Sequence, residues 1–177
     1  MRTTTARMKI KSIVDIDAIT ALSRPGPYSG GVTKKYLDRN NGLAYTAIHP
    51  LVEQHMSETF GLPIYQEQTI AIVKEIGGFG GKEAAMIRKA ISKSMGVEFF
   101  NSYWERFKVG ATKHGIDEKE ARDVWQLIMT MGSWQMNKSH TRSYAVISYW
   151  CAYLKAHHPL EFAAANLRNA KEEDNAV

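Results

Sequence analysis

Four side chains able to bind an anion lie close together in the sequence: Lys138, Ser139, His140 and Arg142. They occur where a long run of helix-forming residues begins, so the first turns of that helix would carry them. The start of any helix also presents unpaired backbone N–H groups and the positive end of the helix dipole. Cationic side chains and free N–H groups that point the same way are what phosphate binds to. The pattern therefore predicts a helix start that faces a phosphate.

Neighbours in the sequence do not balance the charge of this cluster, because no carboxylate occurs between Asp123 and Glu161. A plain capped helix is the alternative interpretation, since Asn137 or Ser139 can accept hydrogen bonds from the first backbone N–H groups. Basic residues that only solvate a helix favour its C-terminal end, where the dipole is negative. Residue chemistry alone leaves both interpretations open.

The helix that follows this cluster is expected to be buried. Apolar residues occupy most of its circumference, at Val146, Ile147, Trp150, Cys151 and Leu154. A helix that is apolar all round belongs in a core. Its aromatic residues can also stack on nucleic-acid bases, although their helical spacing favours the core; they are Tyr144, Tyr149, Trp150 and Tyr153.

Composition and length limit the classes of protein to which this chain can belong. The chain has 177 residues with 44% hydrophobic content, enough for one domain with a proper core. Its formal net charge of +5 suits a polyanionic partner. The lone Cys151 excludes an intramolecular disulfide and favours a reducing compartment. Because no secretory signal and no apolar run of membrane-spanning length occur, we expect a soluble, cytoplasmic protein without a membrane partner.

Helical periodicity dominates the chain, and no alternating strand pattern of useful length occurs. Besides the central helix, helices are expected over 15–22, 31–39, 51–57, 65–76, 82–94, 97–114, 117–131 and 159–169. Asp117 and Glu120 have the spacing of a capping box. The prolines that follow Arg24 predict a rigid turn that displays this arginine. The prediction is an all-α fold, with one domain over 1–170 and a charged tail over 171–177.

The helix expected over 82–94 carries a second group of cations. Arg88 and Lys89 are adjacent and diverge by about a quarter-turn. Lys89 and Lys93 are four residues apart and share a face. The candidate core positions of this helix are Ala85, Ile87, Ala90 and Ile91.

Four blocks of the sequence, in order and with regular spacing, resemble one family. They are Ala-Leu-Ser-Arg-Pro-Gly-Pro at 21–27; Glu-Thr-Phe-Gly at 58–61 with Tyr-Gln-Glu-Gln at 65–68; Met-Ile-Arg-Lys-Ala at 86–90 with Lys93; and Asn-Lys-Ser-His at 137–140, continuing to Leu-Lys-Ala-His-His-Pro-Leu-Glu-Phe at 154–162. The set is similar to the fingers domain of the bacterial replicative polymerases of the C family, the alpha subunits of DNA polymerase III. The resemblance covers about residues 12–168.

The resemblance implies a DNA-directed DNA polymerase, a nucleotidyltransferase that extends a primer on a DNA template by two-metal catalysis during replication. Fingers residues of this family bind the triphosphate of the incoming deoxynucleotide (dNTP), which offsets the charge of the pyrophosphate leaving group. Arg24 is expected either to be structural or to lie near the nucleotide. The remaining nucleotide-binding residues implied by the motifs are Arg88, Lys89, Lys93, Lys138, Ser139 and His140.

The sequence also departs from the family pattern. The family commonly has Asp at the position of Ala85, a second Lys at Ser94, and an aromatic-glycine-Phe run where 133–136 reads Ser-Trp-Gln-Met. Arg142 replaces a typically small residue and gains no support from the resemblance. These changes indicate a divergent member, compatible with a phage origin.

The carboxylates that hold the two Mg²⁺ ions in this family lie on a palm domain, upstream of the region that this chain resembles. Asp15 and Asp17 have the spacing of a palm signature, but acids in a first helical turn are expected from the helix dipole alone, and we interpret both as structural. Glu67 is interpreted as a capping or network residue. We therefore expect no catalytic residue and no metal ligand in this chain, and Mg²⁺ bound by a palm-bearing polypeptide.

Three functional hypotheses follow from these observations. In the first, the chain is the fingers portion of a polymerase, binds dNTP and template-primer, and is inactive without the palm-bearing polypeptide. In the second, it is a non-catalytic helical nucleic-acid-binding or regulatory protein that retains the polymerase scaffold. In the third, it is a fragment with no independent role.

Overall fold

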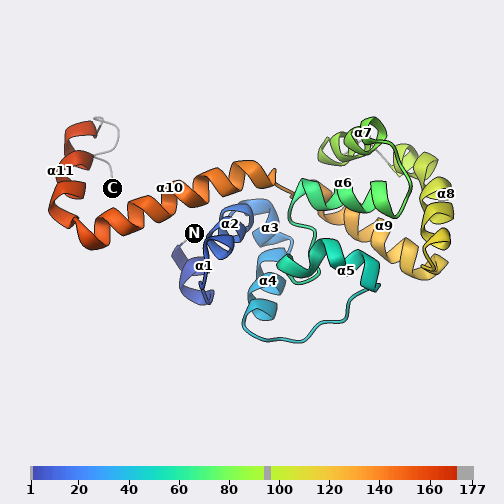
Figure 1. Cartoon of the computed structure of the whole chain (residues 1–177), viewed down its shortest axis with the longest axis horizontal. Coiled ribbons are helices and arrows are strands. Elements are labelled where there is room, and N and C mark those ends of the chain that lie inside the picture. The colour runs from blue at the N-terminus through green and yellow to red at the C-terminus, as the bar shows by residue number, and fades with distance from the viewer. Residues whose placement is uncertain (1, 94–96, 171–177) are drawn as a thin grey trace.

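The computed structural model describes residues 2–93 and 97–170. The predicted tail over 171–177 and the departure at Ser94 lie outside these residues. The described chain folds into eleven α-helices and one 3-10 helix (Figure 1): α1 (Arg2–Arg7), α2 (Ile13–Leu22), α3 (Pro25–Ser29), α4 (Val32–Asn40), α5 (Pro50–Met56), η1 (Ser57–Thr59), α6 (Gln66–Glu75), α7 (Gly81–Ser92), α8 (Val97–Lys113), α9 (Glu118–Gly132), α10 (Lys138–His157) and α11 (Pro159–Asn169). Within the described ranges no strand forms, and one isolated bridge pairs Tyr65 with Met136. The predicted all-α class is confirmed.

Polar caps fix several helix starts. In α9, the backbone N–H of Glu120 donates to Asp117 Oδ1 at 2.7 Å, and that of Asp117 donates to Glu120 Oε2 at 3.1 Å. In α2, Asp15 Oδ2 accepts from the backbone N–H groups of Lys11 and Ser12, each at 2.8 Å. These bonds satisfy donors that the helices leave unpaired. The predicted capping box at Asp117 and the structural interpretation of Asp15 are confirmed.

The prolines after Arg24 begin a helix, so the predicted rigid turn is wrong. Pro25 is at the first position of α3, where its missing N–H costs nothing and its fixed φ suits the helix. Arg24 precedes it in an extended conformation, with φ −123° and ψ 155°, as a residue before proline prefers. The side chain of Arg24 turns back instead of being displayed, because its Nε donates to the carbonyl of Ala21 at 3.0 Å.

The core consists of two hydrophobic clusters that share α9. The larger cluster joins α5 to α9 and includes Ile72 of α6 and Ile87 of α7. The smaller cluster joins α2, α4 and the segment before α6 around Tyr36. Because α9 contributes Trp125 to the larger cluster and Met131 to the smaller one, it connects the two halves of the core.

The buried face of α7 differs by one residue from the prediction. Ile87, Ala90 and Ile91 are buried as predicted, whereas Ala85 is exposed and Ala84 is fully buried. Ala84, Ile87 and Ile91 follow the spacing of a single helix face. That face packs into the larger cluster, which leaves the next alanine on the solvent side.

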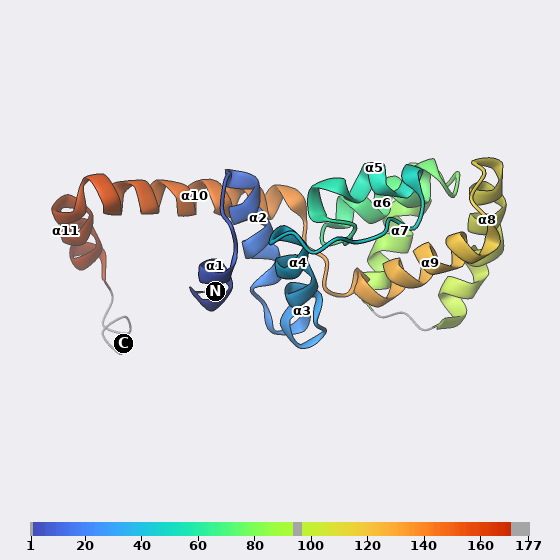
Figure 2. The same cartoon turned by 90° about the horizontal axis from the view of Figure 1, so that it is seen from below.

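Beyond its contact with α2, α10 extends away from both core clusters (Figures 1 and 2). Its buried residues are Thr141 and Ala145, both in the first half of the helix. Trp150 is 60% exposed, and Cys151 is exposed as well. The predicted burial of this helix is therefore wrong, because its apolar circumference has too few neighbours among the described residues. Neither α10 nor any other described helix combines the length and hydropathy needed to cross a bilayer.

Candidate functional site

The start of α10 is capped by Asn137. The side-chain Oδ1 of Asn137 accepts from the backbone N–H of His140 at 3.1 Å and from the hydroxyl of Ser139 at 2.5 Å. Its backbone carbonyl accepts from the N–H of Thr141 at 3.2 Å. Asn137 thus has the capping role that the sequence allowed, and two of the first N–H groups of the helix already have acceptors.

Lys138 is the basic residue closest to this cap, and two carboxylates from distant parts of the chain contact it. Its backbone N–H donates to Glu67 Oε2 of α6 at 3.0 Å. Its Nζ forms an ion pair with Glu58 of η1 and lies 5.4 Å from the centre of the Tyr65 ring. The interpretation of Glu67 as a network residue is confirmed. Although no carboxylate is near in the sequence, the fold supplies two.

Arg142, one turn further along α10, is bound to Asp17 of α2. Its Nε donates to Asp17 Oδ2 at 3.0 Å. The side chain of Asp17 is fully buried and that of Arg142 is 39% exposed. A carboxylate removed from water in this way requires a charged partner, so Arg142 fixes α10 against α2. The structural interpretation of Asp17 is confirmed.

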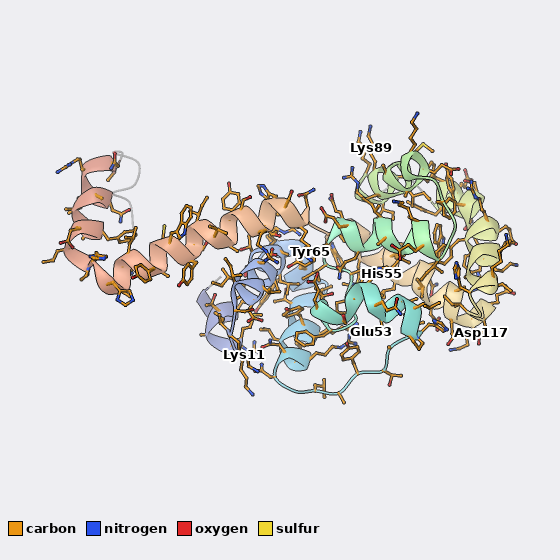
Figure 3. All side chains as sticks on the ribbon, viewed as in Figure 1. Lys11, Glu53, His55, Tyr65, Lys89 and Asp117 are labelled. Atoms are coloured by element: carbon orange, nitrogen blue, oxygen red, sulfur yellow. The ribbon has the colours of Figure 1, made fainter. Side chains whose placement is uncertain are left out.

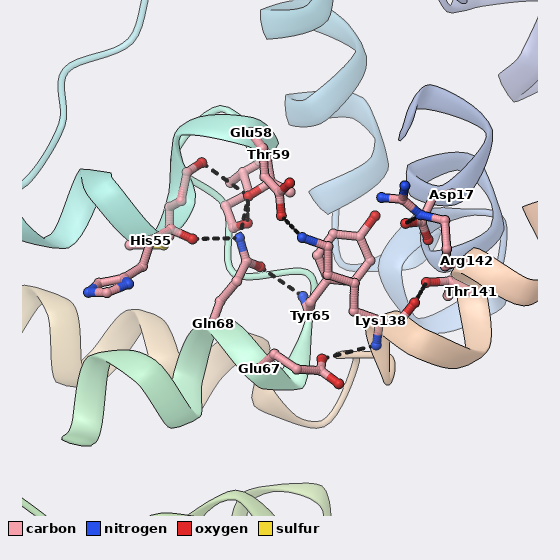
Figure 4. Close-up of polar contacts among 12 residues, drawn as sticks. Asp17, His55, Glu58, Thr59, Tyr65, Glu67, Gln68, Lys138, Thr141 and Arg142 are labelled. Carbon is pink, nitrogen blue, oxygen red and sulfur yellow. Dashed lines mark hydrogen bonds and ion pairs between the residues drawn. The ribbon is translucent and has the colours of Figure 1, made fainter. Parts of the chain in front are cut away.

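Tyr65 stands between these two ion pairs (Figure 4). Its side chain is buried, and burial together with the nearby negative charge of Asp17 raises the pKa of the Tyr65 hydroxyl above its ordinary value. Its backbone N–H donates to Gln68 Oε1 at 2.9 Å, and Gln68 Nε2 donates to the hydroxyl of Thr59 at 2.7 Å. This buried network fixes the first turn of α6 relative to η1.

The segment that leads into α10 is hydrogen-bonded to the residues around the start of α6. The backbone N–H of Gln66 donates to the carbonyl of Met136 at 2.9 Å, and the N–H of Met136 donates to the carbonyl of Ile64 at 3.0 Å. The buried Gln135 side chain donates to the hydroxyl of Thr69 at 2.7 Å. The start of α10 is therefore positioned by α6 and not by local sequence alone.

Arg88 of α7 reaches the same turn of α6. Its guanidinium Nη1 donates to Gln66 Oε1 at 3.0 Å, and the side chain is half-buried. Gln66 and Glu67 are adjacent, so one turn of α6 contacts Arg88 on one side and the backbone of Lys138 on the other. We call these four residues, Arg88, Gln66, Glu67 and Lys138, the junction.

The other predicted site residues around the junction are exposed. Lys89 of α7 and Lys93, the residue that follows this helix, are exposed and, within the described ranges, form no ion pair. Lys89 projects outward from α7 (Figure 3). Ser139 and His140 are exposed on the first turn of α10, where the His140 ring packs 4.8 Å from that of Tyr144.

Arg24 makes structural contacts. Besides its bond to Ala21, its Nη2 donates to the carbonyl of Trp134, in the segment before α10. Burial lowers the pKa of Arg24 from its ordinary value. The Trp134 indole lies over Gly26 of α3, where an added Cβ would come within 2.9 Å of the ring. Arg24 thereby ties the α3 start to the chain that enters α10.

In the structure, α6 contacts both Arg88 and Lys138. The resemblance alone did not indicate this connection. Sequence reasoning missed Glu58 and Gln66 as the partners of these cations. A signal was present, because both residues belong to the matched blocks at 58–61 and 65–68. Among the described residues, no group of three or more His, Cys, Asp or Glu side chains is arranged to hold a metal ion.

A family model described as the bacterial DNA polymerase III alpha subunit finger domain matches residues 1–115. DNA polymerase III subunit alpha of Campylobacter jejuni is 38% identical over 177 residues, covering 99% of this chain and 14% of the relative.

Two further relatives carry the same name. The Aquifex aeolicus protein is 37% identical over 169 residues, covering 95% of this chain and 14% of the relative. The Thermus aquaticus protein is 35% identical over 184 residues, covering all of this chain and 15% of the relative. The chain therefore spans about one-seventh of the length of these relatives.

Proposed function

The chain belongs to the bacterial DNA polymerase III alpha subunit finger-domain family, and from this membership we propose that it works as the fingers portion of a DNA-directed DNA polymerase. In this role it binds the triphosphate of the incoming dNTP and the template-primer during DNA replication. The catalytic palm is supplied by another polypeptide segment, and the chain is inactive alone. The net charge of +5 supports a polyanionic partner.

The observation that carries the proposal is the junction. Gln66 and Glu67, two consecutive residues of α6, hold Arg88 of α7 and the first backbone N–H of α10. Two cationic segments that are 50 residues apart in the sequence are thus both hydrogen-bonded to one half-buried turn. Such preorganised cations stabilise charge that develops on a leaving group, because no reorganisation is needed during the reaction.

Each cation has a distinct part in this proposal. Lys89, Lys93 and His140 are exposed and are available to phosphate oxygens. Lys138 is paired with Glu58, but both side chains are partly exposed, at 33% and 39%. Because an exposed ion pair of this kind contributes only about 0–1 kcal/mol, a triphosphate can take the place of Glu58.

The remaining predicted residues assist in two ways. Ser139 donates to Asn137 in the described structure, and its hydroxyl can rotate to a phosphate oxygen. Arg24 acts from a distance, because it holds the carbonyl of Trp134 in the segment that precedes the α10 cap.

The two Mg²⁺ ions of the family do not fit the residues described here. Asp15 is occupied by backbone N–H groups, and Asp17 is buried against Arg142. In the described part of the chain, no group of three or more His, Cys, Asp or Glu side chains is arranged to hold a metal ion. We therefore assign the metal ions to the palm-bearing polypeptide.

Primer extension tests the proposal. The chain is mixed with the Campylobacter jejuni alpha subunit from which the matching segment has been deleted, which serves as the palm-bearing polypeptide. Extension of a labelled primer is expected from the mixture with dNTPs and Mg²⁺, and from neither component alone. If both components are folded and bind each other but extension does not rise, the proposal is wrong.

Chemical protection tests the site. In the mixture, dNTP with Mg²⁺ is expected to slow acetylation of Lys89 and Lys138 by mass spectrometry. Lys119 is the matched control, because its side chain is 87% exposed and it lies on α9 away from the junction. Equal rates at all three lysines with and without dNTP would exclude nucleotide binding at the junction.

One observation favours the second candidate, a non-catalytic nucleic-acid-binding or regulatory protein that retains the polymerase scaffold. Lys138 and Arg142 are each paired with a carboxylate, and the backbone N–H groups of Lys138 and His140 already have acceptors. A protein of this class binds DNA with an affinity that falls steeply with salt and does not depend on dNTP. A salt titration of DNA binding with and without dNTP distinguishes the two candidates.

A further inference from the structure

From Tyr144 onward, α10 presents an apolar surface to solvent, which we call the outer face. Its members range from 43% to 60% exposed: Tyr144, Ile147, Tyr149, Trp150, Tyr153 and Leu154. On the next helix, α11, Leu160 is 81% and Leu167 is 79% exposed. Large contiguous apolar surfaces of this kind mark sites of interaction.

The outer face carries no charge. From Ser143 to Leu154 the sequence has no Asp, Glu, Lys, Arg or His. A nucleic acid needs cations along its phosphates, because these contacts supply most of the affinity. An uncharged stripe rich in Tyr and Trp is typical of the central part of a protein–protein interface. The chemistry of the outer face therefore favours a polypeptide partner.

A groove adjoins the outer face where α10 crosses the start of α2. It has a volume of about 290 Å³ and is lined by Ile10, Lys11, Ser12, Ile13, Ile16 and Tyr149. Such a groove can take one apolar side chain of a partner, as an anchor at the centre of an interface does. Lys11 lines it, and Lys9, two residues earlier in the chain, is exposed as well, so carboxylates next to the anchor would complement the charge of this segment.

The relatives are much longer than this chain. Their similarity to this chain runs over 94–100% of its length, so α10 and α11 are included, yet the chain spans only 14–15% of each relative. In those relatives these helices are therefore part of a polypeptide about seven times longer. The remainder of such a polymerase can cover the apolar face that the described residues leave exposed.

We propose that the outer face and its groove dock the palm-bearing polymerase polypeptide, through an apolar segment flanked by carboxylates. This inference rests on the proposed function and names the surface that serves it. The junction lies at the N-terminal end of α10 and the outer face along the rest of the same helix. One rigid helix then links the docked polypeptide to the cations of the junction.

The test measures binding of the full chain to the Campylobacter jejuni alpha subunit that lacks the matching segment. The variants Tyr149→Glu and Trp150→Glu each place a carboxylate on the outer face. Because both positions are exposed, neither change disturbs the core, and circular dichroism should match that of the wild type. Affinity is expected to fall at least tenfold in each variant.

Val109→Glu is the matched control. Val109 is 53% exposed, comparable with Tyr149, and lies on α8 at the far end of the molecule. This variant is expected to bind like the wild type. The double variant Lys9→Glu/Lys11→Glu should weaken binding several-fold at low salt and less at high salt, because its effect is electrostatic.

Three outcomes would overturn the docking proposal. The first is that the wild type does not bind, and the second is that the wild type and the outer-face variants bind with equal affinity. The third is that the chain self-associates and Trp150→Glu abolishes this self-association, while binding to the alpha subunit that lacks the matching segment is unchanged. Primer extension distinguishes this failure from failure of the proposed function. If the outer-face variants extend the primer as well as the wild type does, the docking surface alone is rejected. If the variants abolish binding but the wild type binds without extending the primer, the proposed function alone is rejected.

Discussion

Arg142 Nε and Asp17 Oδ2 lie 3.0 Å apart although 125 residues separate them in the sequence. Asp17 is fully buried in α2, and Arg142 belongs to the second turn of α10. The contact is therefore a long-range pairing that depends on the packing of α10 against α2. It fixes the helix that carries Lys138 against the N-terminal half of the fold.

The first prediction concerns this pair. Arg142→Met leaves the buried carboxylate of Asp17 without a partner and should lower the free energy of unfolding by about 3–5 kcal/mol. The double variant Asp17→Leu/Arg142→Met removes both charges and should recover to within about 1 kcal/mol of the wild type. Urea denaturation measures both values. If the double variant is no more stable than Arg142→Met, the predicted compensation between the two charges is wrong.

The second prediction concerns the packing that positions α7. A Cβ added at Gly110 of α8 would lie 2.6 Å from the backbone of Gly77, in the turn between α6 and α7. Backbone atoms cannot move aside as a side chain can, so Gly110→Ala should destabilise the protein by about 1–3 kcal/mol.

Gly81→Ala is the control for this prediction. Gly81 begins α7, and an added Cβ there meets nothing within 4 Å. The substitution should leave stability unchanged or raise it by up to about 1 kcal/mol. Thermal melting of both variants checks the pair, and equal melting temperatures would contradict the close approach at Gly110.

The third prediction is a pH dependence at the start of α7. A hydrogen bond from Arg106 at 2.6 Å and one from the backbone N–H of Gly80 at 3.1 Å lower the pKa of Glu83. A carboxylate with a lower pKa in the folded state adds stability above its unfolded pKa, and loses it as the pH falls through the folded value. The stability difference between the wild type and Glu83→Gln should thus be present at pH 7 and shrink below about pH 4.3.

Denaturation midpoints of the wild type and Glu83→Gln, measured from pH 7 down to about pH 3, check this prediction. The wild type should be the more stable protein at neutral pH, and the two midpoints should converge at the acid end. A difference that stays constant over the whole range would mean that the ionisation of Glu83 does not contribute to stability.

Local sequence signals predicted most of the helices. Pro159 and the residues up to Asn169 form the predicted last helix, and Asp117 with Glu120 forms the predicted capping box. Local rules failed where neighbours decide. The apolar circumference of α10 shows what this helix can bury, not what the described chain provides. The missed helix start at Pro25 has a local explanation, because proline suits the first position of a helix.

The site was predictable in its residue types but not in its pairing. Asn137 as a cap and Glu67 as a network residue follow from their positions beside helix starts. Glu58 is 80 residues from Lys138 and Asp17 is 125 from Arg142. No local pattern reports such pairs, because they arise from the tertiary packing of η1 and α2 on α10.

Because Lys138 is paired with Glu58, substitutions of these two residues should change the affinity for dNTP in opposite directions. If the junction binds a triphosphate, Glu58 competes with it for Lys138. Glu58→Gln removes the competitor and should strengthen dNTP binding about two- to fivefold, as expected for a partly exposed ion pair. Lys138→Ala removes a charge-assisted hydrogen bond to phosphate and should weaken binding about tenfold or more.

Glu75→Gln is the control for charge alone. Glu75 lies at the far end of α6, where it pairs with His55, and its side chain is 67% exposed. The substitution changes the net charge by the same amount as Glu58→Gln but leaves the junction intact. Its dNTP affinity should equal that of the wild type, so any gain in Glu58→Gln is local.

The most direct measurement is the dissociation constant of a dNTP with Mg²⁺, in the complex of this chain, the palm-bearing polypeptide and template-primer. We predict tighter binding for Glu58→Gln, weaker binding for Lys138→Ala and wild-type binding for Glu75→Gln. Identical dissociation constants for all four proteins would contradict the claim that the junction holds the nucleotide's triphosphate.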